Sequence, residues 1–381
     1  MSSFFSRRQA LAASAGAALG ATALGGSLAG GAAAAPSGRP GLVREETRSL
    51  DELYRDALAE GGDLLIYAGG DTADQQDYTR DAFLKRFPRM KVKIIVDYSK
   101  FHDVRLDTQF ATDTLVPDVV QLQTVQDFPR WKEQGRLLCY KPAGFSAVHD
   151  GFKDRHGAWV AVEVYTFSFL YDAAAVGGTA PSSPEDLVDP RWKGRIASSY
   201  PQDDDAILFL YRLYAQRYGW DWIARLAAQG IEFGRGTNSP GDAVGAKRKA
   251  IGIGSYGTLT APSTDPVKWV AAGGHPFMAW GQRAAILKGA KHPAAARLYL
   301  NWHLSAEKQR TADTGWSVRT DVAPVGGLKP VWEYPDAHVE EFPRFMADRA
   351  EAERWRQTFA LYFGEVKGAP SPGRLGLHPG R

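Results

Sequence analysis

Cysteine is almost absent from this sequence, and that scarcity excludes several kinds of structure. Cys139 is the single cysteine among 381 residues, so the chain cannot form an internal disulfide or a metal site built from several cysteines. It lies in the apolar run 136–140, and we expect it to be an inert residue of the hydrophobic core. No cysteine lies near the end of the N-terminal leader described below, so no direct membrane anchor is expected there.

The net charge of the sequence is also small. The 46 Lys and Arg residues nearly balance the 43 Asp and Glu residues, which leaves a net charge of +3. A nucleic-acid-binding protein is expected to show a basic excess or a basic stripe, and neither occurs here. The eight His residues are scattered, and no His-Glu-x-x-His, Gly-x-Ser-x-Gly or Walker motif occurs. We therefore expect no nucleic acid, no metal and no cofactor.

The first 35 residues contain a run that is only weakly apolar and rich in glycine, which argues against a stable membrane span. Arg7 and Arg8 precede a run of Ala, Gly and Leu that carries no charge before Arg39. This pattern is typical of a twin-arginine export signal, and the small residues at 32–34 suit cleavage. We therefore predict a signal peptide over residues 1–35 and a mature protein that is periplasmic or secreted.

Residues 62–87 predict a strand, a tight turn and a helix. The run 64–67 is apolar, and two glycines at 69–70 interrupt it with a turn that other residues could not make as tightly. The helix that follows has an apolar face formed by Tyr78, Ala82, Phe83 and Phe87. We expect this unit to form one wall of a ligand site, because open α/β sheets bind ligands at the carboxyl ends of their strands.

The turn itself offers two candidate contacts. Thr72 and Gln75 fit a capping box for the helix, and Asp71 precedes them at the end of the strand. Asp71 is therefore either a ligand contact or a second cap of the helix, and the residues alone do not separate these roles. We predict Asp71 and Thr72 as ligand-binding residues.

Strands and helices then alternate along the chain. Strand patterns at 92–96 and 118–122 flank a helical pattern at 103–112, which favours a mainly parallel sheet covered by helices. Gln123 and Thr124 follow the second of these strands and become candidate contacts by the same strand-end argument.

The β-rich run 159–172 is longer than the strands before it and suits a strand that crosses between two domains, and a second run follows at 268–281. The first alternates valines with other residues, and Glu163 and Tyr165 on it are candidate contacts. Residues 260–276, which overlap the start of the second run, are rich in Pro and Gly and resemble a linker.

The second half of the chain adds further candidates at predicted strand ends. Tyr200 and Tyr256 each end a strand pattern, and together with Tyr165 they could form an aromatic wall suited to an organic ligand. The three carboxylates at 203–205 open a helix, where the dipole would stabilise them; the alternative is that at least one, with Asp203 the candidate, contacts a cation. Arg235 and Arg283 could instead fix an anionic ligand. We also expect helices at 293–304 and 307–314, and one long helix over 342–363.

Three of these stretches resemble the ABC-importer substrate-binding proteins of the iron(III), thiamine and polyamine type. Residues 186–196 are similar to the family's segment that ends in Trp-Lys-Gly before a strand of its second domain. Residues 285–296 and 305–309 resemble its return segment, in which a lysine-glycine turn precedes a helix and a Ser-x-Glu-x-Gln stretch. Residues 62–87 are similar to its first strand-helix unit, and the resemblance covers about 62–324.

The resemblance implies a two-lobed α/β fold of the type II periplasmic-binding class. Each lobe is then a mixed sheet flanked by helices, crossover strands join the lobes, and a hinge motion closes them on the ligand. The boundaries expected on this basis are a linker over 36–49, lobe 1 over 50–160, lobe 2 over 161–275, a return to lobe 1 over 276–330, a C-terminal helical segment over 331–369 and a disordered tail over 370–381.

The resemblance also bears on metal binding. Several family members bind ferric iron through adjacent tyrosines, whereas the matching region here, 254–257, contains Tyr256 alone. Asp71 and Gln123 stand where such relatives carry His and Glu ligands. These departures argue against direct iron(III) binding.

We therefore predict a monomeric, non-enzymatic protein that captures a small polar solute outside the cytoplasm and delivers it to the membrane subunits of an ABC importer. One alternative is a ferric-iron carrier of the same fold that uses Tyr256 and a bound anion. Another is a secreted hydrolase with Asp71 and either Glu163 or Asp203 as paired carboxylates. The predicted ligand-binding residues are Asp71, Thr72, Gln123, Thr124, Glu163, Tyr165, Tyr200, Asp203 and Tyr256.

Overall fold

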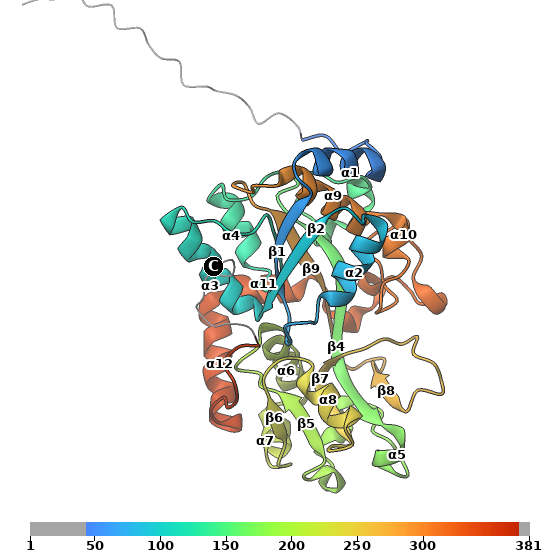
Figure 1. The fold of residues 1–381 in the computed structure, drawn as a ribbon. Helices are drawn as coiled ribbons and strands as arrows, with labels where there is room; N and C mark the ends of the chain where they lie inside the picture. The colour runs from blue at the N-terminus through green and yellow to red at the C-terminus, as the bar shows by residue number, and fades with distance from the viewer. Residues whose placement is uncertain (1–42, 373–381) are drawn as a thin grey trace, which may run out of the picture. The chain divides into compact units, whose positions relative to one another are not determined.

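The computed structural model describes residues 43–372 (Figure 1). The predicted signal peptide, the linker up to residue 42 and the tail from residue 373 onward lie outside the described residues. None of the helices between residues 43 and 372 has the length and apolar character that crossing a membrane requires.

The described residues fold around one nine-stranded sheet. Its strand order is β2-β1-β3-β9-β4-β7-β5-β6, and β8 pairs with β4 beside this path. The strands are β1 (Asp63–Gly69), β2 (Lys91–Asp97), β3 (Val119–Leu122), β4 (Val160–Asp172), β5 (Ile196–Ser199), β6 (Glu232–Gly234), β7 (Ile251–Tyr256), β8 (Val267–Val270) and β9 (Met278–Ile286).

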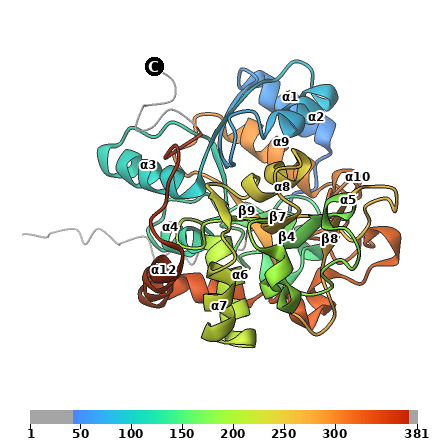
Figure 2. The ribbon, with the colours of Figure 1, turned by 90° about the horizontal axis from the view of Figure 1, so that it is seen from below.

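Helices cover both faces of this sheet. Seen from below, α6 and α7 lie on one side of β4 and β7, and α8 lies on the other (Figure 2). The helices are α1 (Leu50–Ala59), α2 (Asp77–Arg86), α3 (Ser99–Thr112), α4 (Asp127–Glu133), α5 (Ala173–Val176), α6 (Asp205–Tyr218), α7 (Trp220–Ala227), α8 (Ser239–Gly245), α9 (Pro293–Leu304), α10 (Ala306–Gln309), α11 (Glu341–Ala347) and α12 (Arg349–Phe363).

Two parallel groups of strands sit at opposite ends of the sheet. At one end β1 pairs in parallel with β2 and β3, and at the other β5 pairs in parallel with β6 and β7. The antiparallel pair of β4 and β9 joins these groups, because β9 pairs with β3 and β4 pairs with β7. Figure 1 shows β4 running from the first group to the second. The long run 159–172 is therefore the connecting strand that its length and alternation predict.

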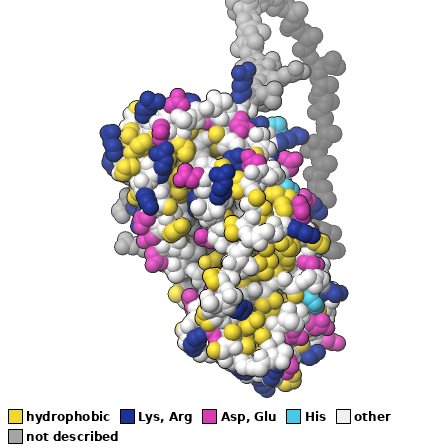
Figure 3. Space-filling view, turned by 90° about the vertical axis from the view of Figure 1, so that its right-hand side faces the viewer, with side chains coloured by type: hydrophobic (Ala, Val, Ile, Leu, Met, Phe, Trp, Pro, Cys, Tyr) yellow, Lys and Arg dark blue, Asp and Glu magenta, His cyan; other side chains and the backbone are white. Residues whose placement is uncertain are grey.

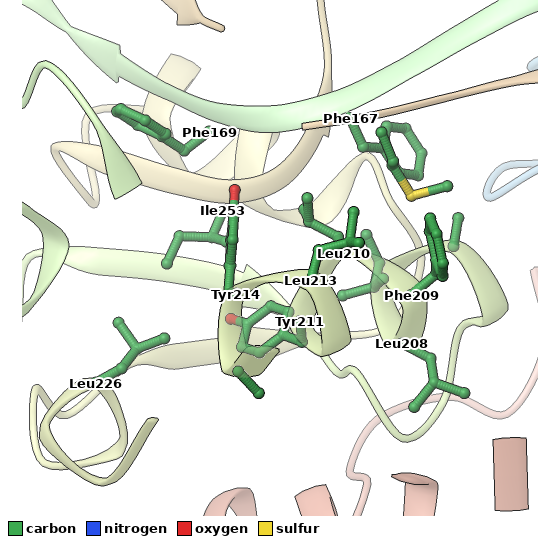
Figure 4. Close-up of a cluster of buried hydrophobic side chains, with 14 of the residues drawn as sticks. Phe167, Phe169, Leu208, Phe209, Leu210, Tyr211, Leu213, Tyr214, Leu226 and Ile253 are labelled. Atoms are coloured by element: carbon green, nitrogen blue, oxygen red, sulfur yellow. The ribbon is translucent and has the colours of Figure 1, made fainter. Parts of the chain in front are cut away.

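Each end of the sheet has its own hydrophobic core. Around the β1 end, Phe83 of α2 and Tyr299 of α9 pack with the strand residues. Around the β5 end, Phe209, Tyr211 and Tyr214 of α6 pack against β4 and β7 (Figure 4). A large apolar side chain that is fully buried stabilises the fold by about 1.5–3 kcal/mol, so these helices are held chiefly by their apolar faces.

Several local predictions are wrong, each for an identifiable reason. Cys139 is exposed rather than part of the core. Residues 342–363 form two helices, because the Asp348 side chain accepts the backbone N–H of Glu351 at 2.8 Å and so caps a new helix, α12. The helix expected over 307–314 ends at Gln309. The linker-like stretch 260–276 contains β8, which pairs with β4.

The helix that follows β1 also begins later than expected. α2 starts at Asp77 after a turn over 71–76, and its N-cap residue Gln76 makes no side-chain cap. The capping box predicted from Thr72 and Gln75 is therefore wrong, because the Gln75 side chain accepts the backbone N–H of Asp71 instead. This shift also leaves Tyr78 66% exposed rather than on the buried face.

The chain after α12 crosses back over both ends of the sheet. The carbonyl of Gly364 accepts from the Gln202 amide at 2.6 Å, and that of Ala369 accepts from Arg235 at 3.5 Å. Ser371 then donates to the Asp97 carboxylate, at the end of β2, at 2.5 Å. We call residues 364–372 the C-terminal strap, because it contacts the β6 region and the end of β2 together.

Apolar side chains are also present on the surface. A band of them runs along the face seen from the right-hand side of Figure 1 (Figure 3). Exposed large hydrophobic residues include Tyr78, Tyr256, Leu259 and Val325, of which Tyr78 and Tyr256 belong to the pocket described next.

Candidate functional site

A pocket of about 310 Å³ lies where the carboxyl ends of the two parallel strand groups face each other. This is the edge at which α/β sheets bind ligands, and the volume is at the low end of the range of about 300–1,000 Å³ typical of small-molecule sites. The wall comes from the strand-end segments and from β4, β9 and α10; its main parts are 69–71, 98–100, 123–124, 162–165, 203–205, 236–238, Tyr256, Trp280, Gln282 and 308–314.

The structure gathers most of the predicted contact residues around this pocket. The lining includes Asp71, Gln123, Thr124, Glu163, Tyr165, Asp203 and Tyr256. Thr72 is exposed in the turn before α2, outside the lining, and Tyr200 is buried against Phe233 with their ring centres 5.0 Å apart. The aromatic wall therefore contains Tyr165 and Tyr256 but not Tyr200. Contact between any of these residues and a ligand stays a prediction.

Asp71 reaches across the pocket instead of capping its own helix. Its Oδ2 accepts the Thr237 hydroxyl at 2.8 Å and the Asn238 backbone N–H at 2.8 Å, both in the segment between β6 and α8. Burial raises the pKa of Asp71, and these two donors oppose the rise. Gly236 permits the approach, since a Cβ there would lie 2.7 Å from Asp71 Cγ and its φ of 78° favours glycine.

The carboxylates at 203–205 each meet a residue from the opposite end of the sheet. Asp203 accepts from Lys100 Nζ at 2.5 Å, Asp204 from the Gln123 amide at 3.1 Å, and Asp205 from the Gln126 amide at 3.2 Å. Together with the Asp71 contacts they form a row of polar bonds across the pocket, which we call the cross-pocket bonds.

Asp204 has a second role at the start of α6. Its Oδ1 accepts the backbone N–H groups of Ala206 and Ile207 at 2.9 and 3.0 Å, which caps the helix. Burial raises the pKa of Asp204 to about 6, although these donors favour the ionised form. The role at a helix start that was expected for the three carboxylates is therefore found at Asp204. Asp203 and Asp205 instead pair with Lys100 and Arg356.

The central strand presents a carboxylate beside aromatic rings. Glu163 and Tyr165 lie two positions apart on β4 and therefore share one face of the strand. The Tyr165 hydroxyl donates to Glu163 Oε2 at 3.0 Å. Trp280 lies opposite Tyr165 on β9, with ring centres 5.5 Å apart and planes inclined by 27°. Burial raises the pKa of Glu163 and that of Tyr165. This arrangement gives the pocket an aromatic wall with a largely desolvated acid in it.

Several lining residues were not predicted. Lys308 of α10 has its Nζ 5.8 Å from the ring centre of Tyr78, and Lys100 has its Nζ 5.7 Å from that of Tyr98. Residues 98–100 directly follow β2, so the strand-end argument applied to 118–122 would have found them too. Lys308 and Asp313 come from the return segment, and no local pattern marks them.

The two arginines considered as anion contacts lie outside the lining. Arg235 Nε is 3.5 Å from Asp203 Oδ2, so it supports the pocket wall as part of an ion pair. Arg283 is buried on β9, with its guanidinium 3.7 Å from the ring centre of Trp159 and a hydrogen bond to the carbonyl of Val125. Neither is available to an anion in the pocket.

Metal coordination has little support from the side chains present. Among residues 43–372, no three His, Cys, Asp or Glu side chains are arranged to hold a metal ion. Tyr256 is 49% exposed at the pocket rim, and Asp71 and Gln123 are engaged in cross-pocket bonds.

These features define a class of protein. A pocket between two parallel strand groups, joined by two connecting strands, is the arrangement of a two-lobed binding protein. Residues 115–316, more than half of the chain, match the family of bacterial extracellular solute-binding proteins. The chain belongs to this family. No curated protein sequence matches it.

Solved structures of similar fold agree with this assignment. AfuA from Actinobacillus pleuropneumoniae, a periplasmic binding protein with fructose-6-phosphate bound, is 19% identical with a TM-score of 0.63 over 80% of this chain and 99% of that one. Iron-bound HitA from Pseudomonas aeruginosa is 20% identical with a TM-score of 0.61 over 78% and 99%. Apo ferric ion-binding protein A from Pasteurella haemolytica is 14% identical with a TM-score of 0.60 over 81% and 100%.

The family and the fold predicted from the sequence are thereby confirmed. The chain has the type II periplasmic-binding fold, and extracytoplasmic solute binding is its function. The family consists of binding proteins, and its proteins are extracellular.

Proposed function

We propose that this protein captures a small polar solute in the pocket between its two strand groups and delivers it to the membrane subunits of an ABC importer. The observation that carries the proposal is the pocket itself, because its walls come from the carboxyl ends of both strand groups and from the strands that join them. A solute bound there touches both halves of the molecule and can therefore report its presence through their relative position.

The proposal includes two lobes that close by a hinge. Lobe 1 comprises 50–160 with a return over 276–330, and lobe 2 comprises 161–275. Separate hydrophobic cores at the two ends of the sheet support this division. The cross-pocket bonds are the contacts that opening would break, and β4 and β9 are the strands that would bend.

Export and delivery complete the proposal. The twin-arginine pair at residues 7–8 would direct the chain out of the cytoplasm, and the mature protein would act as a diffusing monomer without a membrane anchor. The importer's membrane subunits would then recognise the closed form.

The two alternatives receive less support from the site. A hydrolase with paired carboxylates needs an acid free to exchange a proton with substrate, yet Asp71 accepts two hydrogen bonds and Asp203 is held by Lys100. A ferric-iron carrier needs several anionic oxygen ligands, and Tyr256 is the one tyrosine in the region that matches the iron-binding tyrosines of relatives.

Thermal denaturation in the presence of candidate solutes tests the proposed function. A solute that binds only the native state stabilises it by about 2.7 kcal/mol when its concentration is 100 times its Kd. This stabilisation raises the Tm by an easily measured amount. The library contains amines, amino acids, sulfonates, sugars, sugar phosphates and ferric citrate. The proposed function is wrong if every class leaves the Tm unchanged, or if one of them is chemically converted.

A further inference from the structure

We propose that the solute is a small organic cation, with an ammonium group that lies against Glu163 and a carbon skeleton that lies against Tyr165 and Trp280. This inference rests on the proposed function and names the chemical class that the same pocket would take.

The charge of the pocket favours a cation. Six carboxylates line it, at Asp71, Glu163, Asp203, Asp204, Asp205 and Asp313, against two lysines, Lys100 and Lys308. Asp203 and Asp205 are neutralised by Lys100, Arg235 and Arg356. Within the described part of the chain, the other four carboxylates have no Lys or Arg nitrogen within the 4.0 Å of an ion pair. The pocket therefore holds more negative charge than its own side chains compensate.

Glu163 is the carboxylate best placed to meet a ligand. A carboxylate can accept about four hydrogen bonds, and the contact seen here is a single one from the Tyr165 hydroxyl. The charges that face Glu163 from neighbouring elements are Lys308 of α10, which favours its ionised form, and Asp313, which opposes it. A buried carboxylate is costly unless it is paired, so an ammonium group would supply the missing partner.

The aromatic rings supply the second half of the site. Two other tyrosines of the lining lie near ammonium groups of the protein itself, since Lys308 Nζ is 5.8 Å from the ring centre of Tyr78 and Lys100 Nζ is 5.7 Å from that of Tyr98. Tyr165 and Trp280 stack beside Glu163, and Phe167 packs edge-on against Trp280 with ring centres 4.9 Å apart. Aromatic faces attract cations by about 2 kcal/mol or more when water is excluded.

The same wall is unsuited to an anion. The N-terminus of α6 is one of several helix starts that line the pocket, and the Asp204 side chain already accepts from its backbone N–H groups. A phosphate or carboxylate at this helix start would have to displace that side chain, and throughout the pocket it would lie among acids that have no ion-pair partner in the described part of the chain.

Matched pairs of probes test the inference directly. Isothermal titration calorimetry would compare choline with its neutral isostere 3,3-dimethylbutan-1-ol, and putrescine with butane-1,4-diol, with fructose 6-phosphate and ferric citrate as anionic and metal probes. We expect a cation of the panel to bind on the order of 30-fold more tightly than its neutral partner, the factor that about 2 kcal/mol produces. Binding of neither cation overturns the inference, and binding of fructose 6-phosphate or ferric citrate alone overturns it while leaving solute capture intact.

A charge-removing variant locates the contact. Glu163→Gln keeps the shape of the side chain, and we expect it to weaken binding of the cation at least tenfold, to a degree that neutral compounds do not share. Glu232→Gln is the matched control, because Glu232 lies on β6 outside the lining and pairs with Arg248 on the surface. Equal affinities of the wild type and Glu163→Gln, with the Tm of both unchanged, would contradict the placement at Glu163.

Discussion

At the scale of the residue, Asp71 is a carboxylate that connects two distant parts of the chain. It lies two residues after the end of β1, and its two hydrogen bonds go to Thr237 and Asn238, 166 and 167 positions further on. The strand-end argument correctly placed it at the pocket, whereas the choice between helix cap and ligand contact omitted this third role. A bond between residues so far apart depends on the packing of both ends of the sheet, and no local pattern encodes it.

We predict that Asp71→Ala weakens solute binding roughly tenfold, because charge-assisted hydrogen bonds of about 1.5–3 kcal/mol are lost from the closed pocket. The fold should persist, with a free energy of unfolding lower by about 1 kcal/mol. Calorimetric titration and chemical denaturation measure the two effects. Asp74→Ala, in the same exposed turn, is the control and should alter neither. Unchanged affinity with a lowered Tm would show that Asp71 is structural only.

Asp204 gives a pH-dependent prediction. Its pKa in the native state is raised to about 6, so between about pH 4 and 6 the native state holds a proton that the unfolded chain has lost. The free energy of unfolding therefore falls as the pH rises through this window, by on the order of 2–3 kcal/mol.

Asp204→Asn should flatten that part of the profile. Asparagine caps helices about as well as aspartate, so the variant removes the titration and keeps α6 capped. Urea denaturation of both proteins at pH 4, 5, 6 and 7 gives the difference between them. Parallel profiles for the two proteins would show that Asp204 does not carry this proton.

At the scale of the element, the loop between β6 and α8 is shaped to let Asp71 approach. Gly236→Ala would add a Cβ 2.7 Å from Asp71 Cγ at a φ of 78°. We expect a loss of about 1–2 kcal/mol of stability from the backbone conformation, and a weaker affinity because Asp71 must move. Gly219→Ala is a control, since its φ of 83° also favours glycine while a Cβ there would meet nothing within 4 Å. Affinity lowered equally in both variants would rule out the contact with Asp71.

The elements themselves were largely predictable. Strands β1 and β4 and helix α9 follow clear apolar periodicity, because each buries one face or both. The break between α11 and α12 was missed, since Asp348 looks like an exposed helix residue until its side chain is seen to cap Glu351.

Predictions of the site were limited by a different cause. Tyr98 and Tyr200 both follow strands, yet only the pocket geometry shows that the first lines the cavity and the second packs on Phe233. The strand-end rule therefore finds the edge of the sheet, while the direction of each side chain depends on neighbours from other elements.

At the scale of the whole molecule, we expect the cross-pocket bonds to set how long a solute stays. Lys100→Met removes the bond to Asp203, and we expect dissociation to become about 2–10-fold faster with a smaller change in association, as is usual for contacts made in the closed state. Stopped-flow measurement of tryptophan fluorescence would follow it, because Trp280 lines the pocket.

Lys132→Met provides the control for this measurement. Lys132 pairs with Asp154 at 2.5 Å with side chains 33% and 10% exposed, close to the 35% and 12% of Lys100 and Asp203, yet it lies outside the lining. Equal dissociation rates in the wild type and Lys100→Met would mean that the pair does not restrain opening.

The C-terminal strap has a practical consequence for every experiment above. Because Ser371 donates to Asp97 beside the pocket residues 98–100, a group fused directly after residue 372 would start near the pocket. An affinity tag or fluorescent label at that position would alter the measured binding of the solute. A handle inserted directly after the predicted signal peptide avoids this position, and binding data from C-terminally tagged protein need an untagged reference.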